Sequence, residues 1–328
     1  MRSMDEQKKY ITIDIGGTAI KYGLIDENGV ISEKHSIPTE AWNGGPGIVR
    51  KVLGIISEVG KETAGVCIAS AGMVDTERGR IFGAGPTIPD YADTEYKSVI
   101  ENQYGLPCEV ENDVNCAGLA ESELGAARGR KSVLCLTVGT GIGGCFVHCG
   151  NVWHGSSGSG CEIGYMHMEG GSFESLASAS TLSENVERRK YLQEHTKLDA
   201  EEETSEKLSS RNTANIWNGV RIFDSAKAGD TICQEEIDRM CDRLGIGIAN
   251  ICYVLNPEIV VLGGGVMSQK EYMYPRIRKA VDRYLVSSIA ENTQLAMAEL
   301  GNDAGMTGAF LHFLQKQNQT DILENLKR

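Results

Sequence analysis

The chain has 328 residues, of which 41% are hydrophobic and 23% charged, and its formal net charge is −13. This composition is that of a globular protein with one large or two ordinary domains, while the acidic balance argues against nucleic acid as the main partner. No stretch reaches the roughly 18 apolar residues of a membrane helix, so we expect no membrane partner. The ten irregularly spaced cysteines and the lack of an apolar signal region predict free thiols in a cytoplasmic protein.

The first predicted element is a hairpin with the sequence ITIDIGGTAIKYGLI at residues 11–25. Its isoleucines alternate with polar residues, which is typical of a strand. Paired glycines allow close approach of a ligand, and successive backbone N–H groups can bind an anion. The hairpin is therefore a candidate phosphate clamp, although an ordinary tight turn gives the same pattern. Its candidate residues are Gly16, Gly17, Thr18 and Lys21 for phosphate and Asp14 for Mg²⁺, directly or through water.

The next stretch alternates buried strands with helices. A turn at 28–29 precedes a strand at 30–31, apolar spacing predicts a helix over 46–60, and AGVCIAS at 64–70 is a buried strand. That strand ends at a turn containing Gly72, which permits close backbone approach. An irregular segment at 83–91, a helix over 96–104 and a strand over 108–111 follow, and a helix from 114 to about 127 has Asn112 and Asp113 as candidate caps.

A second strand–turn–strand unit begins at residue 133. The buried strand VLCLTV at 133–138 enters a Gly/Thr turn at 139–144 and returns through 145–147. This unit repeats the opening hairpin about 125 residues further along, and the repeat predicts an internally duplicated architecture.

The remaining chain contains a loop at 155–160, a polar stretch at 183–219 interpreted as a surface excursion, and several further elements. We expect helices over 220–228, 231–255, 273–284 and 307–317, strands over 259–262 and 294–298, and a poorly anchored tail. The strand at 259–262 ends at Gly263-Gly264-Gly265, which by itself could be a plain turn between a strand and a helix.

Five motifs stand in a fixed order: DIGGT at 14–18, END at 111–113, TVGTGIGG at 137–144, EIGY at 162–165 and VVLGGG at 260–265. Together they resemble the ROK family (repressors, open reading frames, kinases) of sugar kinases, from about residue 10 to about residue 314. The resemblance implies an α/β actin-like, ribonuclease H-like ATPase fold with ATP and sugar in the cleft between two lobes. The expected lobes are residues 1–115 with about 307–328, and residues 116–306.

The resemblance also implies roles for single residues. Asp113 would be the general base that accepts the proton of the attacking sugar hydroxyl; its alternative role as a helix cap is compatible with this, because a helix N-terminus stabilises a carboxylate. ATP would be bound with Mg²⁺. The second phosphate loop would comprise Gly139, Thr140, Gly141 and Gly143, and Gly263, Gly264 and Gly265 would lie under adenosine.

For the sugar, the resemblance implies contacts from carboxylates and an amide, which accept and donate several hydrogen bonds to a polyol. Glu162 and Glu174 could otherwise be surface charges, but glycines and apolar residues flank them. The expected sugar-binding residues are Gly72, Thr87, Asn112, Glu162, Tyr165 and Glu174.

Two positions depart from the family pattern. Many relatives hold a structural zinc with a His and three Cys, but here Tyr165 replaces the His and residues 166–174 contain no Cys. Cys145, Cys149, Cys161 and His167 do not restore tetrahedral ligand spacing, so we predict no structural zinc. Gly85-Pro86-Thr87 stands where many relatives have Pro-Asn. Both changes resemble a zinc-free branch that includes β-glucoside kinases.

The sequence thus predicts ATP-dependent phosphorylation of the 6-hydroxyl of glucose or of a β-glucoside. N-acetylmannosamine kinase and fructokinase are alternatives within the family. A sugar-responsive repressor is less consistent, because only 13 residues precede Asp14, where repressors of the family carry a helix-turn-helix domain. A catalytically dead sugar-binding module is disfavoured by the presence of Asp14 and Asp113. Relatives are often dimers, so we expect a homodimer.

Overall fold

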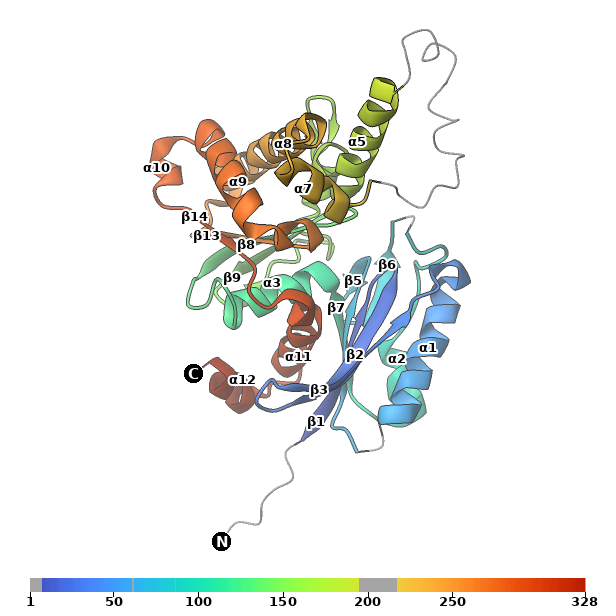
Figure 1. The fold of residues 1–328 in the computed structure, drawn as a ribbon. Helices are drawn as coiled ribbons and strands as arrows, with labels where there is room; N and C mark the ends of the chain where they lie inside the picture. Colours follow the sequence, from blue (N-terminus) through green and yellow to red (C-terminus); the bar gives the residue numbers. More distant parts are fainter. Residues whose placement is uncertain (1–7, 61, 86, 195–216, 328) are drawn as a thin grey trace.

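The computed structural model describes residues 8–60, 62–85, 87–194 and 217–327, and it is built on two five-stranded sheets (Figure 1). The first sheet has the strand order β3-β2-β1-β4-β7. In it, β1, β4 and β7 are parallel, and β2 and β3 extend the sheet antiparallel. The strands are β1 (Lys9–Ile15), β2 (Ala19–Asp26), β3 (Ile31–Pro38), β4 (Val66–Ser70) and β7 (Cys108–Asn112).

The second sheet repeats this pattern with the order β10-β9-β8-β13-β14. Here β8, β13 and β14 are parallel, and β9 and β10 are antiparallel additions. Its strands are β8 (Ser132–Val138), β9 (Ile142–His148), β10 (Asn151–Val152), β13 (Ile259–Gly263) and β14 (Gln294–Met297). The predicted internal duplication is confirmed, because the hairpins β1–β2 and β8–β9 occupy equivalent places in the two sheets.

Two helices, α3 (Asp113–Glu123) and α11 (Ala304–Lys316), lie between the sheets and pack against each other (Figure 1). Their approach is close: a Cβ on Gly308 of α11 would collide with the carbonyl of Cys116 on α3. Helices α1 (Gly44–Val59) and α2 (Lys97–Tyr104) pack on the other face of the first sheet. The outer face of the second sheet is covered by α4 (Phe173–Ala177), α5 (Ala179–Glu194), α7 (Gly219–Lys227), α8 (Thr231–Leu255) and α9 (Lys270–Tyr284).

The remaining α-helices and strands of the described residues are short or peripheral. They are α10 (Ser287–Ala290), α12 (Thr320–Lys327), and the small hairpins β5–β6 (Met73–Asp75, Arg80–Gly83) and β11–β12 (His167–Met168, Gly171–Ser172).

The opening strand β1 is covered on both faces, which explains why its buried residues are nearly all apolar. Ile11, Ile13 and Ile15 join the cluster formed with α1, while Tyr10 packs with α11 on the other side. Thr12 is the polar exception among the fully buried residues of β1, and its hydroxyl donates to the carbonyl of Met306 at 2.7 Å. Covering both faces with helices removes the strand from water and fixes its end, where Asp14 lies, against the start of α11.

Three sequence predictions need correction. The tail after residue 317 forms α12, where Leu323 and Leu326 pack against the core and Lys327 pairs with Glu123 at 2.9 Å, so the expectation of a poorly anchored tail is wrong. The helix expected to reach residue 127 ends at Glu123. The start of the polar stretch at 183–219 belongs to α5, whose Val186 is buried; residues 195–216 of that stretch lie outside the described residues.

The predicted limits of the two lobes stay a prediction, although α11 packs on the first sheet despite its place near the end of the chain. Across the described helices, none is long and apolar enough to cross a membrane.

Candidate active site

Asp113 is the first residue of α3 and is held by the backbone that starts the helix. One of its carboxylate oxygens, Oδ1, accepts from the N–H of Val114 at 3.0 Å and from Nδ2 of Asn112 at 3.1 Å. Asn112 is the N-cap, and its Oδ1 accepts from the N–H groups of Val114 and Asn115. Its second amide hydrogen goes to the carbonyl of Gly72 at 2.9 Å. Asn112 thus uses its whole amide to hold Asp113 and the β4–β5 turn in place.

The environment of Asp113 raises the pKa of its carboxyl above the ordinary aspartate value. Burial, together with the negative charges of Asp14 and Glu162, raises the pKa of Asp113 to about 6, against the lowering effect of the Val114 N–H. A carboxylate with such a pKa is largely ionised at pH 7 and can still accept a proton readily, as a general base requires.

Asp14 lies at the end of β1, opposite Lys21 in the hairpin register. The Lys21 ammonium is 3.7 Å from Asp14 Oδ2, and burial raises the pKa of Asp14 while Lys21 lowers it. At Gly305, the start of α11 comes so close that a Cβ there would lie 2.9 Å from the Asp14 carboxyl carbon. A half-buried carboxylate with one loosely paired cation suits a hard cation such as Mg²⁺, which takes oxygen ligands.

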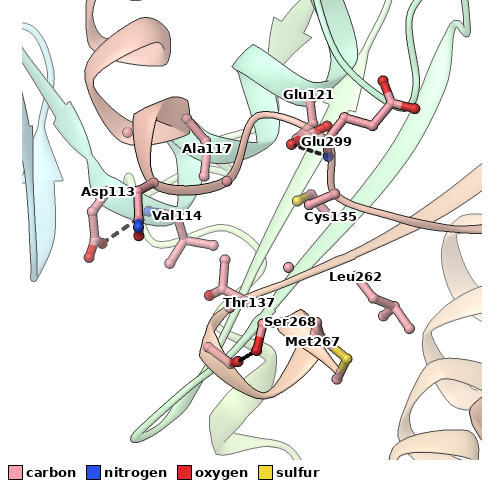
Figure 2. Close-up of a pocket in the computed structure, with 18 of the residues that line it drawn as sticks. Asp113, Val114, Ala117, Glu121, Cys135, Thr137, Leu262, Met267, Ser268 and Glu299 are labelled. Atoms are coloured by element: carbon pink, nitrogen blue, oxygen red, sulfur yellow. Dashed lines mark hydrogen bonds between the residues drawn. The ribbon is translucent and has the colours of Figure 1, made fainter. Parts of the chain in front are cut away.

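Both aspartates line one large cleft of about 700 Å³ between the two sheets. Asp113 lies at one end of the side chains labelled in Figure 2, away from Glu121 and Glu299. The glycines Gly263, Gly264 and Gly265 form part of the wall. Gly264 has a φ of 95°, and a Cβ on it would strike the backbone of Val138, so this turn requires glycine.

A second, small pocket of about 140 Å³ opens beside the cleft. Asn112 lines it, so consecutive residues line the two spaces: Asn112 the small pocket and Asp113 the large cleft. Tyr165, whose surface is 60% exposed, borders the pocket together with Glu162. Burial and the charge of Glu174 raise the pKa of Glu162. The other lining residues are Gly72, Met73, Gly83, Ala84 and Gly85.

The sequence matches the model of the ROK family over residues 10–316. The chain belongs to the ROK family. It is 32% identical to a glucokinase from Thermotoga maritima, over 92% of this chain and 96% of that protein. It is 31% identical to a β-glucoside kinase from Listeria innocua, over 95% of this chain and 99% of that protein.

A solved ROK structure has the same fold. The ROK glucokinase from Streptomyces griseus, in complex with glucose and AMPPNP, superposes with a TM-score of 0.77 at 28% identity, over 92% of this chain and 97% of that one. The actin-like ATPase fold expected from the motifs is therefore confirmed.

The two Gly/Thr turns of this ROK chain lie outside the lining of the large cleft. In the first turn, Gly16 donates to the carbonyl of Ala19 at 3.0 Å, and Thr39 N–H donates to the carbonyl of Thr18 at 2.9 Å. Gly17 lies against Thr87, so Thr87 contacts the first turn and does not line the small pocket.

In the second turn, Gly139 donates to the carbonyl of Gly141 at 2.9 Å, Thr140 is exposed, and Gly143 packs against Val114. Glu174 contacts this turn, because its Oε2 accepts from Ile142 N–H at 2.9 Å and lies against Gly141.

Several cleft residues of this ROK chain were missed by the sequence reasoning. Thr137 is the last residue but one of β8, and Ser268 and Lys270 follow the triple glycine. A Gly-rich run that leads into α11, GNDAG at 301–305, was a sequence signal for this wall, since it contains Asn302 and Gly305 of the cleft. Glu121 is also part of the wall: its carboxylate accepts from the N–H groups of Ala126, Glu299 and Leu300.

The segment where many ROK relatives carry zinc contains Tyr165 and no clustered ligands. Across residues 8–60, 62–85, 87–194 and 217–327, no three His, Cys, Asp or Glu side chains converge as metal ligands. All ten cysteines are free, with Cys149 exposed and Cys161 half-buried. The lack of a structural zinc stays a prediction. The effect of having Gly85-Pro86-Thr87 in place of Pro-Asn also stays a prediction, and Pro86 lies outside the described residues.

Proposed function

We propose that this ROK protein transfers the γ-phosphoryl group of ATP to the 6-hydroxyl of glucose or of the terminal glucose of a β-glucoside. Its family and its kinase relatives make it a sugar kinase, and the choice of sugar is the proposal. The observation that carries it is the position of Asp113, a carboxylate with a pKa of about 6 where a nucleotide-sized cleft meets a small polar pocket.

Asp113 would act as general base through Oδ2. Its other oxygen already accepts from two N–H groups, so Oδ2 is available for the sugar hydroxyl. The hydroxyl oxygen forms a bond to the γ-phosphorus, the bond from that phosphorus to the β-phosphate oxygen breaks, and the proton moves to Asp113. Asn112 orients the base, and its engaged amide favours this positioning role over direct sugar binding.

Charge on the phosphates would be met by Lys21, which lies in the cleft beside Asp14. The contribution of backbone N–H groups from the two Gly/Thr turns stays a prediction, because these turns lie outside the lining of the cleft. Mg²⁺ held by Asp14, directly or through water, would neutralise phosphate charge. Glycines 263–265 would lie against adenosine. These assignments explain why the wall of the cleft combines backbone glycines with the half-buried carboxylates of Asp14 and Asp113.

Tyr165 supports the glucoside part of the proposal. It stands at the rim of the small pocket with most of its ring exposed, so a second sugar or an aryl group attached to the bound glucose would project past it. A phenol ring can stack on such a group, whereas the pocket itself, at about 140 Å³, is small.

The test is coupled ADP release with Mg·ATP against glucose, cellobiose, N-acetylmannosamine, fructose and allose. Turnover with glucose and cellobiose supports the proposal, and a signal restricted to glucose would remove the glucoside part. Turnover with N-acetylmannosamine or fructose alone would assign another sugar, and no turnover with any of them would favour a sugar-binding module. The homodimer stays a prediction, which a measurement of the molar mass by light scattering would test.

A further inference from the structure

The buried carboxylate of Glu111 lies two residues before Asp113, at the end of β7, and is not used by the proposed chemistry. Its side chain is fully buried. One oxygen, Oε1, accepts from the backbone N–H of Asn112 at 2.7 Å and from Nδ2 of Asn115 at 3.1 Å. Glu111 therefore holds the N-cap and the first turn of α3, on which the position of Asp113 depends.

The other oxygen of Glu111 faces two histidines. Nε2 of His154 lies 2.6 Å from Oε2, and Nδ1 of His312 lies 3.6 Å from it. His154 follows β10 of the second sheet, whereas Glu111 belongs to the first sheet and His312 to α11. The His154–Glu111 pair thus joins the half of the molecule built on the second sheet to the half built on the first.

His154 also begins the segment that leads to the small pocket. Its carbonyl accepts from Gly160 N–H at 2.8 Å, which closes the loop just before Glu162 and Tyr165. The pair therefore connects the wall of the proposed sugar pocket with the support of the proposed base. In this pair the His154 side chain is 30% exposed, whereas the Glu111 side chain is fully buried.

The charges around the pair favour an ionised link. The bond to Glu111 raises the pKa of His154, against the opposing effect of burial. Burial alone would raise the pKa of Glu111, but His154, His312 and Asn115 lower it. Burial lowers the pKa of His312, whose Nε2 has no hydrogen-bond partner within the described part of the chain, so burial favours the neutral form of His312. The other groups facing the pair are Lys316 of α11, Glu77 between β5 and β6, and Glu109 of β7.

We infer that protonated His154 and Glu111 form an ionic link between the two halves of the protein that positions Asp113, and that the link is lost when His154 deprotonates. His154 and Glu111 are positioning residues: they act through Asn112, Asn115 and the start of α3. This inference deepens the proposed function, because its kinetic readout concerns the same site.

The sign of the pH effect follows from the raised pKa of His154. The link is fully formed below the ordinary histidine value of 6.5 and is lost as the pH rises through the higher value in the folded protein. We expect kcat of the wild type to fall in that alkaline range. His154→Gln keeps a hydrogen-bond donor without a titrating charge, so it should have a kcat lower by about tenfold at neutral pH and lack that alkaline fall.

Two measurements test the inference. Proton NMR titration of the histidine ring signals, assigned with His154→Gln, should give His154 a midpoint above 6.5 that drops in Glu111→Gln. The pH profile of kcat should lose its alkaline limb in His154→Gln and keep it in His148→Gln, an exposed histidine at the end of β9 that serves as the matched control. A His154 midpoint at or below 6.5, or an unchanged kcat profile in His154→Gln, overturns the inference.

The outcomes separate this inference from the proposed function. If no sugar is phosphorylated, the kinase proposal fails, while the NMR titration still decides whether the ionic link exists. If Glu111→Gln does not fold, the comparison of wild type with His154→Gln decides whether the ionic link exists. A lower melting temperature of His154→Gln together with an unchanged pH profile of kcat would assign the pair a structural role only and would contradict the inference.

Discussion

The carboxylate of Asp14 lies against the backbone of Gly305, so closely that a Cβ on residue 305 would stand 2.9 Å from its carboxyl carbon and about 3 Å from both oxygens. These residues are 291 positions apart and come from the first strand and the last helix of the core. The start of α11 therefore fixes one wall around Asp14, and a glycine there leaves the carboxylate free to face the cleft.

Gly305→Ala should displace the Asp14 carboxylate, because a Cβ at that distance forces either the side chain or α11 to move. We expect the Mg²⁺ concentration for half-maximal activity to rise by about tenfold, the size of effect that supporting residues have on metal sites. Titration of Mg²⁺ at fixed ATP measures this.

The matched control for that change is Gly54→Ala in α1, where a Cβ would meet no atom within 4 Å. It should leave the Mg²⁺ requirement unchanged and stabilise the protein by about 0.5–1 kcal/mol, since alanine is the better helix former. An unaltered Mg²⁺ titration in Gly305→Ala would show that Asp14 does not take part in metal binding.

Asp113→Asn should remove the base while preserving the shape of the site. We expect kcat to fall by about 10³-fold with the sugar dissociation constant within about threefold of wild type, because general-base catalysis contributes 10²–10⁴-fold. ADP release and calorimetry measure the two quantities. Asp93→Asn, at a carboxylate whose side chain is 79% exposed, is the control. Weakened sugar binding with turnover per bound sugar intact would assign Asp113 to binding.

The pH dependence of activity should follow the same carboxyl. With a pKa of about 6, Asp113 is protonated below that pH, so kcat/KM for the sugar should fall about tenfold per unit on the acidic side. A profile measured from pH 4.5 to 8 tests this. Activity that stays level down to pH 5 would show that no base with a raised pKa controls the reaction.

Asp113→Asn should also change the stability of the protein in a pH-dependent way. The pKa of Asp113 is higher in the folded state than its ordinary value of 3.8, so the folded state loses stability as the pH rises from that value to about 6. Above that range the substitution should raise the free energy of unfolding by up to about 3 kcal/mol. Urea unfolding at pH 4 and pH 7.5 would show the gain only at the higher pH; a loss at both would contradict it.

Glu121→Gln should weaken the far wall of the cleft. The Glu121 carboxylate is buried and accepts three backbone N–H bonds that tie the end of α3 to the loop after β14. A glutamine amide would point a donor at one of these donors, and we expect a loss of about 1–3 kcal/mol in unfolding free energy together with a higher KM for ATP. Glu324→Gln, at an exposed glutamate of α12, should change neither. Unchanged melting and KM would contradict this role.

The sequence by itself determined the local elements and the motifs. Alternating or continuous apolar residues predicted β1, β4, β8 and β13, and the repeat of a strand, a Gly/Thr turn and a strand predicted the duplicated sheets. These signals are local, because a buried strand needs an apolar side chain at each covered position. The tail was predicted wrongly for the same reason: its anchoring comes from distant partners such as Glu123.

Only the tertiary structure decided how the candidate residues divide between the spaces. Asp14, Lys21, Asp113 and the triple glycine meet in one cleft, whereas Thr87 and Glu174 contact the Gly/Thr turns. The same holds for Glu111 and His154, which come together from different sheets and carry no sequence signal as a pair. Such contacts depend on how α3 and α11 pack between the sheets. The order and type of residues along the chain do not show which distant side chains this packing brings together.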